Sequence, residues 1–401
     1  MPLSVEKYKV ELSSQFSTQN SFSAYIVDLN KKAAETTKEE VLAWAISDIG
    51  HKYPLVTLNG GTPNVLFDMQ SSLDFVQSEQ FTGAELTRPL VSRLPFDYTA
   101  LPMWIIGLAF RLMTKKINLN EIPNFPNFPI DTSVDDLRSI SMQNSASIPL
   151  VWPNKKKFAV AFTHDVDTAW LFRNSHWLDS YLSVERDFGM RSAWYIVPKS
   201  TSPQYCRKGM EKLVSEGHEI GIHGCSHDPN LAYQSFDVLC EKLSTSRALL
   251  DWILESPPGY RSPWLSRNSV MRKALKATGY LYDSSSPTAD FQRRSSSSNN
   301  GCCTLFPFLC DGILEVPLTL PQDSAYYTLN KSPQEFWNYI FELIEEIKKR
   351  GGLAVISTHI QPHHSANLPM LEGYKGLLKR LSQDDEAWFA LPTEIVNAAK
   401  F

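Results

Sequence analysis

Two acids and a histidine follow a predicted strand in residues 157–167, which read KFAVAFTHDVD. Residues 158–162 are a short apolar run of the kind that forms a fully buried strand. Asp165 and Asp167 are two residues apart, so an extended backbone directs both carboxylates to the same side. There they could share a cation or divide the roles of metal ligand and general base. The alternative, for this segment alone, is a solvated strand end.

Two histidines, His223 and His227, follow a strand expected over residues 219–223. Their spacing lets both imidazoles meet one metal on a turn or tight loop, and two separately satisfied surface histidines are the alternative. With Asp167 they form a set of two histidines and one carboxylate, which leaves coordination positions open for water and substrate. This set predicts a catalytic divalent metal, with zinc favoured by abundance and affinity. Cys225, between the histidines, is expected to be a packed thiol.

From residue 158 onward, strand patterns alternate with helix patterns, as in a parallel sheet with crossover helices. The expected strands cover residues 158–162, 192–197, 219–223, 280–283, 313–316, 353–357 and 387–391. The expected helices cover residues 177–188, 204–216, 235–254, 268–278, 333–350, 367–381 and 393–399. Residues 290–311 are expected to form a mobile surface insertion, with Cys302, Cys303 and Cys310 as bystanders.

Residues 1–150 carry a weaker pattern, and we expect an accessory region of unknown role that ends near residues 147–153. Helices are expected over residues 37–47, 65–77 and 104–113, and a strand over residues 55–58. Residues 122–130 contain too many prolines for a helix or a central strand, so they are expected to form an extended strap.

Length and charge limit the classes of function. The chain has 401 residues, 43% of them hydrophobic, which is enough for two domains. With 39 basic and 43 acidic residues the net charge is −4, so binding to nucleic acid or membrane cannot rest on a global field. We find no secretory signal and no stretch near the ~20 apolar residues of a membrane helix, so the expected compartment is the cytoplasm. The six cysteines are expected to stay reduced.

These motifs and their order resemble those of the polysaccharide deacetylase family, carbohydrate esterase family 4, whose core is the NodB homology domain. The resemblance covers about residues 158–399. It implies an α/β fold, with a distorted (β/α) barrel of about seven strands as the catalytic domain over residues 151–401. A smaller α+β region precedes it over residues 1–150. The implied function is metal-dependent removal of N-acetyl groups from a sugar or polysaccharide precursor.

The resemblance also implies roles for the paired acids and the histidines. Residues 163–167, Thr-His-Asp-Val-Asp, resemble the family's paired-acid motif with one residue between the acids. By this likeness Asp165 is the general base and Asp167 a metal ligand. His223 and His227 match the other two ligands, in a motif that has Gly224 where the family has a hydroxyl residue.

Two later motifs complete the implied site. Residues 261–264, Arg-Ser-Pro-Trp, resemble the family's Arg-x-Pro-Tyr motif. By this likeness Arg261 orients the catalytic aspartate, and the backbone N–H of Trp264 faces the developing oxyanion. Residues 358–360, Thr-His-Ile, resemble the motif whose histidine, here His359, protonates the leaving group.

Alternatives remain for the general acid and its partner. The proline that often follows the histidine directly is delayed to residue 362, so His363 and His364 stay candidates. Residues 282–285 resemble the region whose aspartate tunes that histidine, which points to Asp283, with Asp290 as the alternative. Two further histidines are expected to be structural: His164, by strand alternation, and His218, at the start of a strand.

The expected partner is an N-acetylated sugar or glycan, without nucleic acid and without a membrane span. Lacking an export signal, the chain suits a soluble or lipid-linked intermediate of surface-polysaccharide assembly better than mature peptidoglycan. Two other functions stay open. One is a deformylase or amidohydrolase acting on a non-sugar small molecule, and the other is a metal-stabilised, non-catalytic glycan-binding module.

Overall fold

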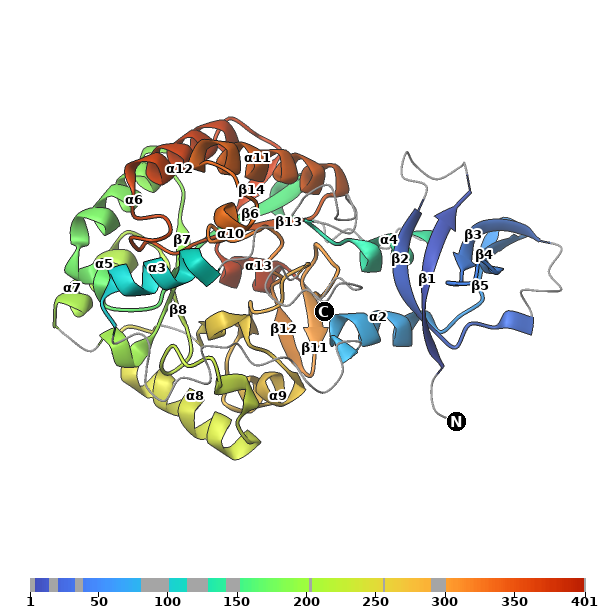
Figure 1. Cartoon of the computed structure of the whole chain (residues 1–401), viewed down its shortest axis with the longest axis horizontal. Coiled ribbons are helices and arrows are strands. Elements are labelled where there is room, and N and C mark those ends of the chain that lie inside the picture. The colour runs from blue at the N-terminus through green and yellow to red at the C-terminus, as the bar shows by residue number, and fades with distance from the viewer. Residues whose placement is uncertain are drawn as a thin grey trace. The chain divides into compact units, whose positions relative to one another are not determined.

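The computed structural model describes residues 4–13, 21–32, 39–80, 101–113, 129–141, 152–201, 204–254, 257–289 and 301–399. The chain forms two compact units (Figure 1). The first comprises Met1–Ala84, Pro123–Pro149 and Thr288–Leu305, and the second comprises Glu85–Ile122, Leu150–Pro287 and Phe306–Phe401. The division into domains at residue 150 stays a prediction. The structure adds that each unit draws on separate stretches of the chain.

The described part of the first unit is an antiparallel sheet with two helices packed against β2. The strand order is β2-β1-β3-β4-β5. The strands are β1 Val5–Leu12, β2 Ser21–Val27, β3 Glu40–Ile46, β4 Lys52–Asn59 and β5 Thr62–Val65, and the helices are α2 Met69–Gln77 and α4 Ser133–Ser141. Alternate residues such as Tyr8 and Val10 are buried, because successive side chains of a strand point to opposite faces.

The helix predicted over residues 37–47 is wrong. The acidic start of residues 37–47 predicts a helix, but Glu40–Ile46 is strand β3, paired with β1 on one side and β4 on the other. Leu42, Ala43 and Ala45 of this strand are fully buried. Pairing on both sides and burial override the local helical propensity of a short apolar run. The next helix, α2, begins at Met69, later than predicted, because residue 65 belongs to β5.

The expected surface insertion is also corrected where it is described. Cys302, Cys303 and Leu305 are buried, and Cys303 belongs to the hydrophobic core of the first unit. Within that unit, Asp135 of α4 accepts hydrogen bonds from the Thr304 hydroxyl and from the Leu305 backbone. Residues 301–305 are therefore core rather than surface. Residues 290–300, and residues 122–128 of the expected strap, lie outside the described residues.

The second unit contains a curled, mainly parallel sheet, which confirms the predicted α/β fold of barrel type. Its strand order is β11-β12-β10-β9-β8-β7-β6-β13, and β14 also pairs with β6. The strands are β6 Phe158–Val166, β7 Ser192–Ile196, β8 Glu219–Ile222, β9 Gly259–Tyr260, β10 Tyr282–Asp283, β11 Phe308–Cys310, β12 Ile313–Glu315, β13 Leu353–Thr358 and β14 Ala387–Phe389. Adjacent strands are parallel except β11 and β12.

Helices surround this sheet, and the longer ones form its outer layer in Figure 1. They are α3 Met103–Met113, α5 Trp170–Arg173, α6 Ser175–Asp187, α7 Gln204–Ser215, α8 Phe236–Leu250, α9 Ser269–Ala277, α10 Ala325–Thr328, α11 Pro333–Arg350, α12 Leu368–Leu381 and α13 Pro392–Ala398. Local sequence sets their ends: Ser332 and Glu335 form a capping box at the start of α11, and Gly351 ends it with a φ of 68°. Among the described helices, none has the length and apolar character needed to cross a bilayer.

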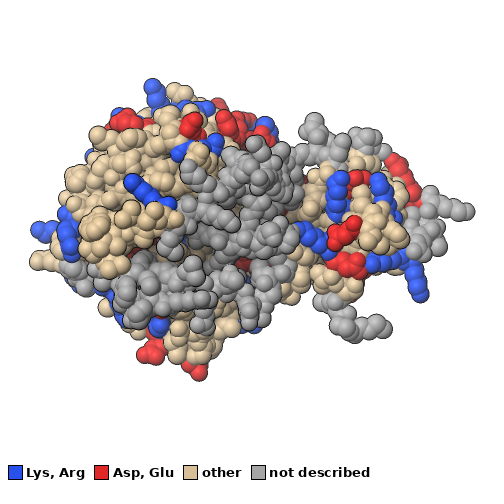
Figure 2. Space-filling view, in the orientation of Figure 1, with Lys and Arg blue, Asp and Glu red and all other residues tan. Residues whose placement is uncertain are grey.

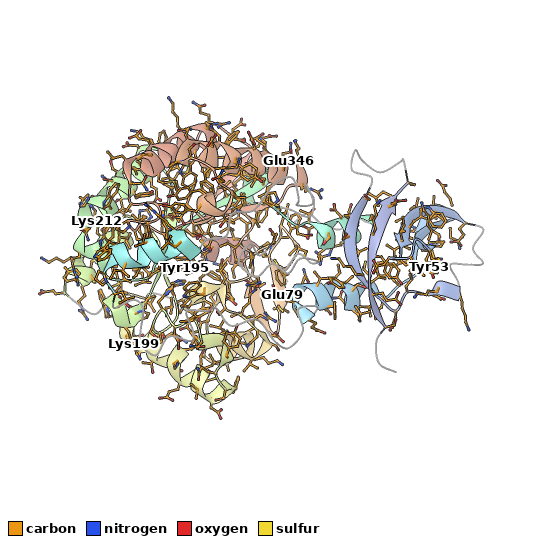
Figure 3. The ribbon with its side chains drawn as sticks, viewed as in Figure 1. Tyr53, Glu79, Tyr195, Lys199, Lys212 and Glu346 are labelled. Atoms are coloured by element: carbon orange, nitrogen blue, oxygen red, sulfur yellow. The ribbon has the colours of Figure 1, made fainter. Side chains whose placement is uncertain are left out.

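Strand β6 lies inside this sheet, with every residue buried. It pairs with β7, β13 and β14, which explains why its sequence is a continuous apolar run rather than an alternating one. Figure 3 shows Tyr195 of β7 within the unit, whereas Lys199 and Lys212 lie toward its outside. Since neighbouring strands are parallel, their carboxyl ends meet at one edge of the sheet, where the polar candidates gather.

Candidate metal centre and active site

Asp167, His223 and His227 converge at the carboxyl ends of β6 and β8. The Nε2 atom of each histidine lies 3.4 Å from the same oxygen, Oδ1 of Asp167. Ligand atoms about 2.1 Å from one ion are about 3 to 3.5 Å apart by simple geometry, so this spacing suits a shared cation. Oδ1 of Asp167 is buried without a hydrogen-bond partner, which is costly for a carboxylate unless a cation faces it. The three residues therefore fit a divalent metal.

Neighbouring groups orient these ligands. The Nδ1–H of His223 donates to the carbonyl of Arg261 over 2.9 Å, which leaves Nε2 free to bind a metal. The side-chain amide of Gln361 donates to Oδ2 of Asp167 over 3.1 Å, so Oδ1 is the oxygen turned to the histidines. Burial raises the pKa of Asp167, but the lowering effect of His227 and His223 is larger. The net pKa of Asp167 therefore lies well below its usual value.

Asp165 is held by a buried ion pair with Arg261. Nη1 of Arg261 donates to Oδ1 of Asp165 over 2.8 Å, and both side chains are buried. Arg261 is itself fixed by hydrogen bonds to the carbonyl and hydroxyl of Ser284, each 3.0 Å long. Its guanidinium lies 4.3 Å from the ring centroid of Tyr195, which Figure 3 labels. The ion pair with Arg261 fixes the direction of the Asp165 carboxylate.

His359, directly after β13, is paired with Asp323. The Nδ1 atom of His359 lies 2.7 Å from Oδ1 of Asp323, and the backbone N–H of His359 donates to Oδ2 over 2.7 Å. Burial lowers the pKa of His359, but the charge and hydrogen bond of Asp323 outweigh it and raise the pKa to about 10. Its Nε2 faces Asp165, 3.6 Å from Oδ2. A protonated imidazole in this position can donate a proton into the site.

A small pocket opens beside the two acids. Its lining includes Asp165 and Asp167, the side chains of Trp170 and Leu171, and Gln361. A lining that combines carboxylates with apolar residues suits a ligand that has both a polar reacting group and an apolar face.

Residues 153–282 match the sequence model of the family described as polysaccharide deacetylase. This part of the chain is therefore similar to the polysaccharide deacetylase family. A curated relative, the peptidoglycan deacetylase of Helicobacter pylori, is 27% identical over 124 residues. That match covers 30% of this chain and 41% of the relative, so the chain spans less than half of the relative's length.

Solved structures show a similar fold over nearly two thirds of this chain. A candidate polysaccharide deacetylase from Mycobacterium smegmatis is 20% identical, with a TM-score of 0.51 and coverage of 63% of this chain and 93% of that one. The PuuE allantoinase is 14% identical, with a TM-score of 0.50 and coverage of 63% and 94%. At these identities the likeness concerns the fold alone.

The structure corrects one partner that the deacetylase resemblance implied. The carboxylate bonded to His359 is that of Asp323, not Asp283. Asp283 instead accepts a hydrogen bond from the Ser285 hydroxyl and pairs in register with Glu315 of β12. The alternative, Asp290, lies outside the described residues.

Sequence reasoning missed Asp323 because it lies 36 residues before His359 in the chain. The available signal was an acid placed soon after the strand that was expected over residues 313–316, at the edge where the other candidates gather. Gln322, just before it, approaches Ser357 at 3.3 Å and Asp165 at 3.5 Å. Gln361, whose side chain contacts Asp167, lies outside the deacetylase motifs, so the sequence did not point to it.

The two reserve histidines have a different environment. Burial lowers the pKa of His363 to about 4 and that of His364 to about 3, so both are neutral near pH 7. The ring centroid of His364 lies 5.3 Å from that of His359. A neutral imidazole is a poor general acid, which favours His359 for that role in a deacetylase.

The loop of residues 261–264 packs closely against the histidine loop. Gly224 has a φ of 71°, and a Cβ placed there would lie 2.7 Å from Cγ of Pro263. Trp264 has a φ of 58°, a left-handed conformation that is uncommon for a residue other than glycine. Its ring centroid lies 6.3 Å from that of His227. The role of the Trp264 backbone N–H as an oxyanion donor stays a prediction.

Two histidines predicted to be structural are confirmed as buried packing groups. His164 lies between Thr358, 2.6 Å from Nδ1, and Glu185, 2.7 Å from Nε2. His218 accepts a hydrogen bond of 3.0 Å from the backbone N–H of Ser192, at the start of β7. The His164 ring bonds groups other than the paired acids, and His218 lies at the opposite ends of the strands.

Proposed function

We propose that the second unit is a divalent-metal-dependent hydrolase that removes N-acetyl groups from a sugar or polysaccharide precursor. The observation that carries this proposal is a grouping at one sheet edge. It brings together three residues that could hold a metal, a carboxylate paired with an arginine and a histidine paired with an acid. The match of residues 153–282 to the deacetylase family model supports the reaction type, as does the likeness to the relative described as a peptidoglycan deacetylase.

Asp167, His223 and His227 would hold the metal ion. A bound divalent ion would act as a Lewis acid, polarising the acetyl carbonyl and making water more acidic. Two imidazoles and one carboxylate accept several ions, and zinc is the proposed one because of its abundance and affinity for such sites.

Asp165 is the proposed general base. Arg261 fixes the direction of its carboxylate, so the free oxygen can accept the proton of the attacking water. General-base assistance of this kind contributes about 10²- to 10⁴-fold to the rate. The backbone N–H of Trp264 would stabilise the oxyanion, and one such donor contributes about 3 kcal/mol.

His359 is the proposed general acid. An amine anion is a very poor leaving group, so amide cleavage needs a proton on nitrogen. Asp323 fixes Nδ1 of His359 and raises its pKa, which keeps a proton on Nε2, the atom that faces Asp165. The acid and the base thus lie on the same side of the site, where a substrate amide can meet both.

The decisive experiment is an assay of the full chain, loaded with zinc, on N-acetylated monosaccharides and oligosaccharides, with released acetate as the readout. A chelator should abolish turnover, and readdition of metal should restore it. The Asp165→Asn variant should lose at least about 10²-fold in kcat while its metal stoichiometry, measured by elemental analysis, stays the same. Unchanged turnover in this variant would refute the assignment. A parallel assay should include the N-formylated analogues. Release of formate from these, with no acetate from the N-acetylated sugars, would redirect the proposal to a deformylase.

A further inference from the structure

Ser365 is a second partner of the carboxylate that holds His359. Its hydroxyl donates to Oδ2 of Asp323 over 2.5 Å. The same oxygen accepts the backbone N–H of His359, and Oδ1 lies 2.7 Å from Nδ1 of the imidazole. Of the three hydrogen bonds that the described residues donate to this carboxylate, two therefore come from His359 itself. The bond from Ser365 ties the pair to a group outside it.

Water cannot replace this hydrogen bond. Figure 2 shows acidic side chains on the surface of the second unit, where water solvates them. Asp323 and Ser365, in contrast, are both 0% exposed. A buried carboxylate that loses a donor keeps an unsatisfied acceptor, and hydrogen bonds to a charged group are about twice as strong as neutral ones. The orientation of the Asp323 carboxylate thus depends on the Ser365 hydroxyl.

The backbone of Ser365 fixes where that hydroxyl lies. The N–H of Ser365 donates to the carbonyl of His359 over 3.0 Å, so the loop of residues 359–365 closes on the residue where it begins. From α6, the hydroxyl of Tyr181 donates to the carbonyl of Ser365 over 3.0 Å, and Tyr181 is also fully buried. Both backbone groups of Ser365 are therefore held, and its hydroxyl reaches Asp323 from a fixed position.

We propose that Ser365 is a positioning residue for the general acid, an inference that rests on the proposed function. It holds the Asp323 carboxylate in the orientation that directs Nε2 of His359 into the site, where this atom lies 3.6 Å from Oδ2 of Asp165. Proton transfer depends steeply on the position of the donor. A freed imidazole should therefore slow the chemical step more than it weakens substrate binding.

The leaving group separates this role from a merely structural one. In amide cleavage the base takes a proton from the attacking water, and the acid gives one to the departing nitrogen. The nitrophenolate of nitrophenyl acetate leaves without a proton, so its hydrolysis uses the same base but does not need the acid. Loss of the acid's orientation should slow the amide reaction and spare the ester.

The first test is steady-state kinetics of the full chain, loaded with zinc, on an N-acetylated oligosaccharide and on nitrophenyl acetate. Ser365→Ala should lower kcat on the sugar about tenfold, with KM and the ester kcat within about twofold of the wild type. Tyr181→Phe, which leaves the Ser365 carbonyl without this donor, should show the same selectivity with a smaller loss.

The second test is proton NMR, which does not need turnover. The proton between Nδ1 of His359 and Asp323 should give a low-field resonance, assigned by its loss in Asp323→Asn. Ser365→Ala should shift this resonance or broaden it. An unchanged resonance would overturn the positioning role, whatever the outcome of the kinetic assay.

The matched control is Ser246→Ala. It removes a serine hydroxyl that is equally buried in the second unit but donates to the carbonyl of Lys242 within α8. It should leave both activities and the resonance unchanged, and thermal unfolding should show that all variants are folded. Equal losses on amide and ester in Ser365→Ala, or full amide activity, would overturn the proposal. If the wild-type chain cleaves neither substrate, the proposed function fails, and the resonance alone decides whether Ser365 orients the pair.

Discussion

Two groups of buried carboxylates lie at the same edge of the sheet in the second unit, and their neighbours differ. In the candidate active site, Asp323 is hydrogen-bonded to His359. Burial raises the pKa of Asp323, but His359 lowers it by more, so the net pKa is below its usual value. Nearby, Asp283 and Glu315 sit opposite one another on paired strands. Burial raises the pKa of Asp283 to about 6 and that of Glu315 well above its usual value.

This difference in pKa shows that a carboxyl group at the sheet edge cannot be given a catalytic role from its residue type alone. Both groups are acids at the carboxyl ends of parallel strands, and the sequence resemblance favoured Asp283. A carboxylate that faces a cation stays ionised and can orient or accept a proton, whereas burial that no partner cation outweighs favours the protonated form of a carboxyl. The four predictions below test this contrast.

The largest effect is expected for Asp323→Asn. Without the carboxylate, the pKa of His359 should fall and its ring should lose its fixed direction, so kcat should decrease by about 10²- to 10⁴-fold. Steady-state kinetics would measure this change, with metal affinity as the readout that stays constant. Asp283→Asn should leave kcat within a few-fold. If both variants lose activity equally, the contrast between the two groups fails.

Arg261→Met should lower the free energy of unfolding by about 3–5 kcal/mol. It leaves Asp165 as a buried carboxylate without its cation. Urea denaturation of the metal-free protein would measure the loss. Adding Asp165→Asn to this variant should recover part of the stability, because the unpaired charge is then gone. A single variant as stable as the wild type would show that the pair is not buried in solution.

Asp283→Asn should change the free energy of unfolding only above about pH 4. Because the pKa of Asp283 is raised to about 6 in the folded state, folding favours its protonated form, and stability is lost as pH rises from about 4 through 6. The asparagine variant should escape this loss and be more stable at pH 7 to 8, by at most about 3 kcal/mol. Thermal unfolding from pH 4 to 8 would test it. Parallel curves for variant and wild type would contradict the raised pKa.

The smallest effect is expected for Gln361→Leu. Its amide orients Asp167, so its loss should weaken metal binding about tenfold, at the lower end for groups that hold a metal ligand in place. Calorimetric titration with zinc would measure the affinity. Gln322→Leu is the matched control, since that amide approaches the base, Asp165, and should leave metal affinity unchanged. Equal zinc affinities in the two variants would contradict this prediction.

The sequence sufficed where a local pattern sets the structure. The parallel strands follow from apolar runs, and residues 163–167 and 223–227 hold their spacing within one strand end or one loop. It did not suffice where a distant partner decides. Asp323 became visible only when β12 and β13 lay in one sheet, and residues 301–305 are buried because they complete the core of the other unit.

The contact between Gly224 and Pro263 restricts how this site can be redesigned. A serine at residue 224, as in the family motif, would bring its Cβ into the proline ring and would also have to adopt a positive φ. Swapping in a histidine loop from a deacetylase with the usual motif should therefore fail unless the loop around residue 263 is exchanged at the same time. The two segments are one module for engineering, although 38 residues separate His223 from Arg261 in the chain.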